Sequence, residues 1–236
     1  MCLSFDLKKR KGIIMLERAY GRVALVENYK NSGVFQRDFG NTFLFKDFFK
    51  QFTESIFALV ILIFFSPFAL YIAYRIKKES PGKVLFKQQR VGRGGKSFTC
   101  YKFRSMHESS AQGDLYTQVN DLRIFSFGHT MRKMRIDEVP QLWNVLKGEM
   151  SIVGPRAEWD LLVKGYEERI PNYSYRHLVK PGITGLAQVR YHYGINDRDT
   201  KIKLRYDLFY IEHQSLSLDL WILWRTIWIV LGRKGR

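Results

Sequence analysis

The sequence predicts an α+β fold for a monotopic membrane protein, one that enters and leaves the bilayer by a single face. Three observations predict it. Residues 55–74 form a charge-free segment long enough for a kinked re-entrant membrane helix. Residues 216–231 are apolar but interrupted by charges, as in amphipathic helices that lie in the membrane interface. Between them, short alternating and glycine-rich segments predict a small β element in a compact cytoplasmic domain.

Composition restricts the environment and the partners of the chain. Its 236 residues are 46% hydrophobic, which is ample for a folded core. A formal net charge of +17 predicts an acidic partner, namely nucleic acid, an anionic membrane surface or a phosphorylated substrate. Cys2 and Cys100 have no metal-ligand spacing, and a signal-peptide pattern is absent, so a reducing, cytoplasm-facing environment is expected. Residues 1–45 show no sustained period and are interpreted as a linker or the remnant of a larger upstream domain.

The membrane segment is predicted over residues 46–79. Ser66-Pro67 lies inside it, where the proline cannot donate to the Ile63 carbonyl and the serine hydroxyl can bond to the preceding turn. A sharp bend is therefore expected, and the apolar residues before it would reach only about 18 Å as a helix. Basic residues on both flanks favour cytoplasmic placement of both ends. We interpret the segment as a re-entrant helix; a spanning helix with a tolerated proline and a buried core helix are the alternatives.

The β element is predicted to follow this segment. Val84–Phe86 predicts a short strand, and the basic, glycine-rich residues Arg90–Lys96 predict either a hairpin turn or a phosphate-binding loop. In a strand predicted over Ser97–Met106, Lys102 and Arg104 share one face. These two cations could bracket a diphosphate, although a solvated edge strand would show the same pattern.

An adjacent acid pair, Asp137 and Glu138, is the strongest functional signal. Arg132 and Arg135 precede it, and a carboxylate nucleophile or metal ligand beside cations is what chemistry on a phosphate requires. Asp137 could instead be only the N-cap of a helix predicted over residues 139–147. The two roles are compatible, because an N-cap carboxylate lies at the positive end of the helix dipole, which also attracts anions.

The last predicted element is the amphipathic helix over residues 216–231. Asp219 and Arg225 interrupt its apolar run, which favours a helix lying in the membrane interface. Its tryptophans recur at helical spacing, so the alternative is that they face a soluble core. They are Trp221, Trp224 and Trp228.

Four motifs in order carry a family resemblance: LFKQQRVGRGGKSFTCYKFRSM (85–106), MRKMRIDEVPQLWNVLKGEMSIVGPR (131–156), VKPGITGLAQV (179–189) and YDLFYI (206–211). From about Phe48 to its C-terminus, the chain resembles the bacterial sugar transferase family, the monotopic phosphoglycosyl transferases or polyprenyl glycosylphosphotransferases. It looks like an exopolysaccharide-associated branch. It departs from the common family pattern at Ala157 and over residues 190–194, where nucleotide or sugar specificity is expected to be set.

The resemblance implies transfer of a sugar-1-phosphate from a UDP-sugar to undecaprenyl phosphate, with release of UMP. It implies that Asp137 is the nucleophile of a covalent aspartyl intermediate, that Glu138 orients it or acts as base, and that both bind Mg²⁺. It places the catalytic domain, residues 80–236, on the cytoplasmic side of the bacterial inner membrane, with the lipid bilayer as partner and a homodimer as a further option. The substrate-binding set that it implies is Arg90, Lys102, Arg104, Arg132, Arg156 and Asp207.

Two other functions compete with this hypothesis. A catalytically silent membrane adaptor of a polysaccharide assembly complex could use the same fold, and the basic composition would suit a nucleic-acid-binding module. The intact acid pair and its neighbouring cations argue against the adaptor. The apolar segment argues against the nucleic-acid module, so no nucleic-acid partner is expected. The predicted product would start an exopolysaccharide or another surface glycan.

Overall fold

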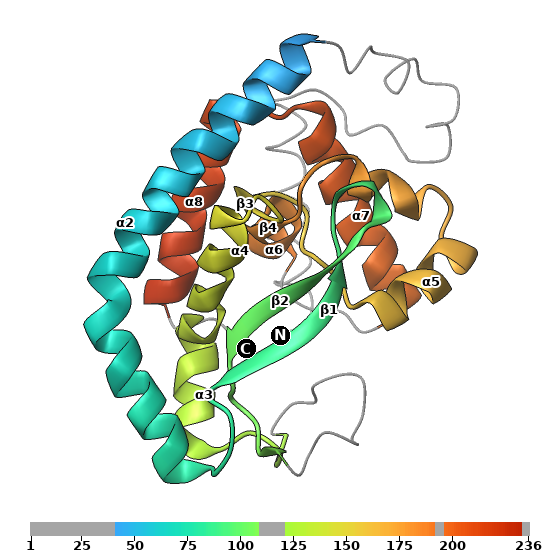
Figure 1. The fold of residues 1–236 in the computed structure, drawn as a ribbon. Coiled ribbons are helices and arrows are strands. Elements are labelled where there is room, and N and C mark those ends of the chain that lie inside the picture. Colours follow the sequence, from blue (N-terminus) through green and yellow to red (C-terminus); the bar gives the residue numbers. More distant parts are fainter. Residues whose placement is uncertain (1–40, 109–120, 192–195, 233–236) are drawn as a thin grey trace.

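A computed structural model describes residues 41–108, 121–191 and 196–232 of the chain. Most of the predicted linker, residues 1–45, therefore lies outside the described residues. The described part combines helices with two small sheets, which confirms the predicted mixture of helix and strand. Figure 1 shows one long helix, α2, beside a domain that contains all the strands.

Helix α2, Asn41–Glu79, is the one helix among the described residues that is long and apolar enough to cross a membrane. It begins before the predicted boundary at residue 46, and it continues through Pro67 as a single helix whose axis curves in its middle part (Figure 1). The sharp bend expected at Ser66-Pro67 stays a prediction. The serine bond that the sequence predicts is present. The Ser66 hydroxyl donates at 2.7 Å to the Ile63 carbonyl, the acceptor that Pro67 cannot serve.

Both ends of α2 are fixed to the same domain. Near its start, the Lys50 Nζ lies 2.5 Å from an Asp219 carboxylate oxygen. At its end, the Glu79 carboxylate accepts a bond of 2.8 Å from the Phe127 backbone N–H. One face of the helix is buried against the domain, while its other apolar side chains are exposed, among them Phe64 at 81%. The exposed face is a large apolar surface, which is typical of membrane contact.

The predicted β element is an antiparallel hairpin. Strand β1, Leu85–Val91, pairs with β2, Ser97–Phe103, in a register that sets Leu85 opposite Phe103. β1 is longer than the predicted strand at 84–86 and includes Arg90. A short 3₁₀ turn, η2 (Arg93–Gly95), joins the strands, and Gly94 and Gly95 have φ of 66° and 75°, which favour glycine. The glycine-rich segment is therefore the hairpin turn.

The remaining elements surround this hairpin. A second sheet contains two short parallel strands, β3 (Ser151–Val153) and β4 (Gly182–Thr184). The helices are α3 (Ser126–Lys133), η4 (Ile136–Gln141), α4 (Leu142–Leu146), α5 (Asp160–Arg169), η5 (Tyr173–Leu178), α6 (Leu186–Arg190), α7 (Asp197–Glu212) and α8 (Leu216–Leu231). The bounds of α8 are those that the sequence predicts.

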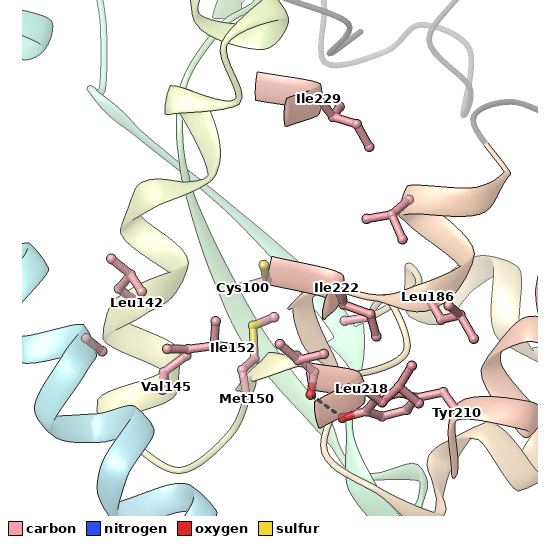
Figure 2. Close-up of a cluster of buried hydrophobic side chains, with 14 of the residues drawn as sticks. Cys100, Leu142, Val145, Met150, Ile152, Leu186, Tyr210, Leu218, Ile222 and Ile229 are labelled. Atoms are coloured by element: carbon pink, nitrogen blue, oxygen red, sulfur yellow. Dashed lines mark hydrogen bonds between the residues drawn. The ribbon is translucent and has the colours of Figure 1, made fainter. Parts of the chain in front are cut away.

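The largest core cluster joins α8 to the rest of the domain. Figure 2 shows Leu218 and Ile222 of α8 with Leu186 of α6 and Val145 of α4 in this cluster. Tyr210 of α7 is buried beside them, and its hydroxyl donates to the Val153 carbonyl at 3.0 Å. The outer face of α8 remains exposed and apolar. Of its tryptophans, Trp224 and Trp228 are exposed and Trp221 is half-buried.

Candidate active site

The acid pair lies on η4, directly after a chain reversal. Arg135 holds φ at 54°, a left-handed conformation that is uncommon for a residue with a side chain. Its N–H donates to the Arg132 carbonyl at 3.1 Å, and its own carbonyl accepts the Glu138 N–H at 3.2 Å. The 3₁₀ helix therefore begins at Ile136, and the prediction that Asp137 is the N-cap of a helix over 139–147 is wrong.

Glu138 is surrounded by cations. One of its oxygens, Oε1, accepts bonds from Lys102 Nζ at 2.8 Å and from an Arg156 guanidinium nitrogen at 2.6 Å. Its other oxygen, Oε2, lies 3.4 Å from an Arg135 nitrogen. Burial alone would raise the pKa of Glu138, but attraction to Arg156 and Lys102 outweighs it and holds the pKa well below its ordinary value. Glu138 is therefore ionised and fixed in place.

Asp137 has a different environment, although it is the adjacent residue. It is only 8% exposed, and no described residue makes a hydrogen bond or an ion pair with its carboxylate. Burial, and secondly repulsion by Glu138, raise its pKa from 3.8 to about 6, against attraction to Lys102, Arg132 and Arg156. The carboxylate is thus mostly ionised at neutral pH, more basic than usual and unengaged.

The strand β2 carries Lys102 to the acid pair, and Asn144 fixes its register. The Asn144 side chain, which is fully buried, accepts from the Tyr101 N–H at 3.2 Å and donates to the Thr99 carbonyl at 2.7 Å. It therefore bonds to the strand as a neighbouring peptide group would. Since Asn144 lies on α4, directly after η4, these two bonds fix the acid pair relative to Lys102.

Arg156 reaches Glu138 from the loop after β3. Its position depends on Gly182, because a Cβ on that residue would lie 2.1 Å from the backbone nitrogen of Gly154. The close approach allows the Gly182 N–H to donate to the Pro155 carbonyl at 2.8 Å. A buried arginine, Arg176, donates to the Arg156 carbonyl at 2.8 Å. The loop is therefore held from both sides.

Comparison with known proteins identifies the family. Residues 45–233 match the family model described as bacterial sugar transferase. The chain belongs to the bacterial sugar transferase family. In this sugar transferase, the matched range contains η4 and every residue that contacts Glu138.

Three relatives illustrate the similarity. Over 80% of this sugar transferase chain, it is 46% identical to the UDP-N-acetylgalactosamine-undecaprenyl-phosphate N-acetylgalactosaminephosphotransferase of Aeromonas hydrophila. Over 78% of the chain, it is 44% identical to the UDP-glucose:undecaprenyl-phosphate glucose-1-phosphate transferase of Xanthomonas campestris. The chain spans 45% and 39% of the length of these two proteins. It spans 94% of an exopolysaccharide production protein of Rhizobium leguminosarum, to which it is 43% identical over 77% of the chain.

Two residues of the predicted substrate-binding set, Arg104 and Asp207, bond to partners other than the acid pair. Arg104 follows the end of β2, and its three nitrogens donate to the Ser80 hydroxyl at 2.6 Å, the Ser80 carbonyl at 2.6 Å and the Lys83 carbonyl at 2.5 Å. It cannot bracket a diphosphate with Lys102, because it is buried where α2 ends. Asp207 instead lies 2.8 Å from Arg176, so its carboxylate supports the Arg156 loop from behind.

The other predicted cations, Arg132 and Arg90, lie near the acid pair together with Lys102 and Arg156. Arg132 donates to the Ser105 hydroxyl at 2.8 Å and attracts the Asp137 carboxylate. Arg90 bonds to the Ala157 carbonyl, and burial, together with repulsion by Arg156, lowers its pKa. With Arg135, which the predicted set omits although it stands beside the acids, five cations surround two carboxylates. The excess positive charge would stabilise an incoming diphosphate.

Proposed function

We propose that this chain transfers a sugar-1-phosphate from a UDP-sugar to undecaprenyl phosphate through a covalent intermediate on Asp137. The product would initiate an exopolysaccharide or another surface glycan. One observation carries the proposal: three cations fix Glu138, whereas the adjacent Asp137 has no bonding partner among the described residues. A nucleophile must be ionised and unengaged, and only Asp137 of the pair meets both conditions.

The first step forms a bond from an Asp137 carboxylate oxygen to the β-phosphorus of the donor. The bond between that phosphorus and the bridging oxygen breaks, and UMP leaves with the electron pair. Lys102 and Arg156, held by Glu138, would offset the charge that builds up on the phosphoryl oxygens. In the second step a phosphate oxygen of undecaprenyl phosphate attacks the same phosphorus, and the Asp137 carboxylate is released. The product is a polyprenyl diphosphate sugar.

Glu138 acts in this scheme as an orienting group. Its pKa lies well below the ordinary value because Arg156 and Lys102 outweigh its burial, so it is a weak base at neutral pH. It keeps the two cations in fixed positions, which reduces the reorganisation needed when the donor binds. Of the two roles that the family resemblance implies for Glu138, the geometry favours orientation over proton transfer.

The residues present also fit the predicted Mg²⁺. Mg²⁺ is usually held by one or two carboxylates together with substrate phosphates. The Asp137 carboxylate and the Oε2 of Glu138 are the oxygens with capacity for it, and no larger group of metal-ligating side chains occurs in the described part of the chain. When bound, the ion would offset charge on the diphosphate. Asp137, Lys102 and Arg156 would keep the roles given above.

We also propose that the domain lies on the cytoplasmic face of the inner membrane, with α2 embedded as a monotopic helix. The support is that residues near both ends of α2, Lys50 and Glu79, contact one domain, as a helix that enters and leaves by one face requires. The exposed face of α2 and the outer face of α8 are apolar. This placement would let the soluble donor and the lipid phosphate both reach Asp137.

The names of the relatives support the choice of substrates. The Aeromonas and Xanthomonas proteins are both named for a UDP-sugar donor and an undecaprenyl phosphate acceptor. The Rhizobium protein, which this chain nearly spans, is named for exopolysaccharide production. A UDP-sugar donor, an undecaprenyl phosphate acceptor and an exopolysaccharide or surface-glycan product are consistent with all three names.

The test is a donor screen with the purified full chain, undecaprenyl phosphate and a panel of radiolabelled UDP-sugars. We expect UMP release and labelled lipid with at least one donor, and, without the lipid, a sugar-phosphate adduct on Asp137 detected by mass spectrometry. The variant Asp137→Asn should lose both signals, and Asp160→Asn, at the start of α5, should keep both. An adduct on Glu138, or an active Asp137→Asn variant, would refute the mechanism. Inactivity with every donor would favour the silent adaptor.

A further inference from the structure

A second pair of arginines lies away from the acid pair, where α6 packs on α8. Arg190 ends α6, and its guanidinium carbon lies 4.4 Å from the centre of the Trp221 ring of α8. Arg225 lies one turn further along α8. Within the described ranges, neither arginine pairs with an acidic side chain, and the Nε atom of each is buried without a hydrogen-bond partner.

Such an arrangement is costly unless an anion completes it. A buried guanidinium N–H without an acceptor loses its bond to water and gains none in return. The two cations also repel each other, since burial and, secondly, Arg225 lower the pKa of Arg190. Arg104 and Arg176, the arginines that are buried among the described residues, avoid this cost. Arg104 donates from all three nitrogens, and Arg176 is paired with Asp207.

The contact between α6 and α8, which carries Arg190 and Arg225, is reinforced by further interactions. The hydroxyls of Thr184 and Thr226 lie 2.7 Å apart, and they join β4 to α8 at the residue next to Arg225. Leu186 of α6 and Ile222 of α8 belong to one buried cluster (Figure 2). The two guanidinium groups are therefore held in position before any ligand binds, which lowers the entropic cost of binding.

The surroundings of the pair indicate the class of ligand. The outer face of α8 exposes Leu220, Trp224, Ile227 and Trp228, a mixture of aliphatic and tryptophan side chains that suits the interface between head groups and acyl chains. A ligand that reaches arginines beside this face would carry an anionic group at the depth of the lipid head groups. The fork of a guanidinium matches phosphate oxygens in pairs.

We propose that Arg190 and Arg225 form a binding site for the phosphate group of a membrane lipid, with Tyr206 nearby as a further donor. Tyr206 lies close enough to Arg190 for the two to affect each other's charge. The phosphate could belong to an anionic phospholipid or to the polyprenyl acceptor, and the chemistry of recognition is the same for both. The inference rests on the interfacial placement of α8 proposed above, and it does not require the transfer reaction.

The test measures lipid binding to the full chain in a neutral detergent. Phosphatidylglycerol, undecaprenyl phosphate and inorganic phosphate are titrated in separate arms, and retained lipid is counted by native mass spectrometry. We expect the double variant Arg190→Gln/Arg225→Gln to bind at least one of the two lipids about tenfold more weakly, as expected for loss of paired charge-assisted bonds. The matched control, Arg198→Gln/Arg205→Gln, removes two exposed arginines of α7 and should bind as the parent does.

A second variant keeps the proposal testable if the glutamine pair fails to fold. Arg190→Lys/Arg225→Lys retains both charges but loses the planar forks, so its affinity should lie between those of the parent and the glutamine pair. Equal losses in the site and control variants would show a diffuse charge effect and overturn the site. Inorganic phosphate that binds as tightly as either lipid would overturn the lipid assignment. If the site variant binds lipid more weakly than the control variant but the parent chain has no transfer activity, only the proposed function is refuted. If the two variants bind lipid equally well and transfer activity is intact, only this site is refuted.

Discussion

Replacing Asp137 by asparagine is expected to abolish transfer and also to stabilise the folded protein. The pKa of Asp137 rises from 3.8 to about 6 because the carboxylate is buried and is repelled by Glu138. Each pKa unit corresponds to about 1.4 kcal/mol, so keeping this group ionised at neutral pH costs about 3 kcal/mol of folding free energy. Asparagine removes the charge and keeps a similar shape, so the cost disappears together with the nucleophile.

The stability difference between Asp137→Asn and the parent depends on pH in a defined direction. The folded state binds the Asp137 proton more tightly than the unfolded state does, so the stability from this group is fully present below pH 3.8 and is lost as the pH rises through about 6. The variant should therefore melt higher than the parent by at most roughly 6 to 12 °C at about pH 8, and the two should converge toward about pH 4. Apparent melting temperatures in one detergent and at one scan rate measure the difference.

Two results would refute this argument. An Asp137→Asn variant that melts below the parent at neutral pH would show that the carboxylate is held by favourable bonds and is not strained. A stability difference independent of pH would show that the gain does not come from ionisation. The same pKa predicts the kinetics of the parent, since kcat/KM should fall about tenfold per pH unit below about pH 6 as the nucleophile becomes protonated. Asp160→Asn is the control for both measurements.

Three further substitutions test the groups that hold the site together. Asn144→Ala should cost about 2 to 4 kcal/mol and lower kcat, because it leaves two peptide groups of β2 unsatisfied; melting temperature and steady-state kinetics measure both. Asp207→Asn should cost only about 1 to 2 kcal/mol in denaturant unfolding, because Arg176 keeps Glu158 at 3.9 Å and the substitution also removes a carboxylate whose pKa burial raises to about 6. Lys50→Met should cost about 1 to 3 kcal/mol and speed amide hydrogen exchange in the first turn of α8, where it leaves Asp219 with Tyr210 as its remaining side-chain partner.

Features that depend on local spacing could be predicted from the sequence. The bounds of α8 follow from an apolar run between Ser215, whose side chain accepts the Leu218 N–H at 3.4 Å, and Gly232. The Ser66 bond to the Ile63 carbonyl follows from the geometry of any helix that contains Ser-Pro. The bond supplies the Ile63 carbonyl with a donor in place of the N–H that Pro67 lacks, so α2 continues through the proline.

Features that depend on tertiary contacts could not be predicted. Lys102 and Arg104 are two residues apart and share one face of the predicted strand. β2 nevertheless ends at Phe103, and the Arg104 side chain bonds to Ser80 at the end of α2. No pattern within residues 97–106 indicates that Ser80 will supply its acceptors. The same holds for Asp207, whose partner Arg176 lies on η5. A basic or acidic residue in a family motif can therefore support the site from behind, and only the fold separates this role from contact with substrate.

The unequal environments of Asp137 and Glu138 follow from the helix that carries them. Consecutive residues of a 3₁₀ helix are rotated by about 120°, since three residues complete a turn, so neighbouring side chains leave the helix in different directions. Glu138 accepts bonds from Lys102 and Arg156, and Asp137 is attracted by both cations without such a bond. If Asp137 also accepted hydrogen bonds from those cations, its pKa would fall and its oxygen would become a poorer nucleophile. Because Glu138 holds the cations, the site keeps positive charge for the diphosphate and a basic, unengaged carboxylate beside it. The chain reversal at Arg135, which starts the 3₁₀ helix, is therefore the structural origin of the proposed chemistry.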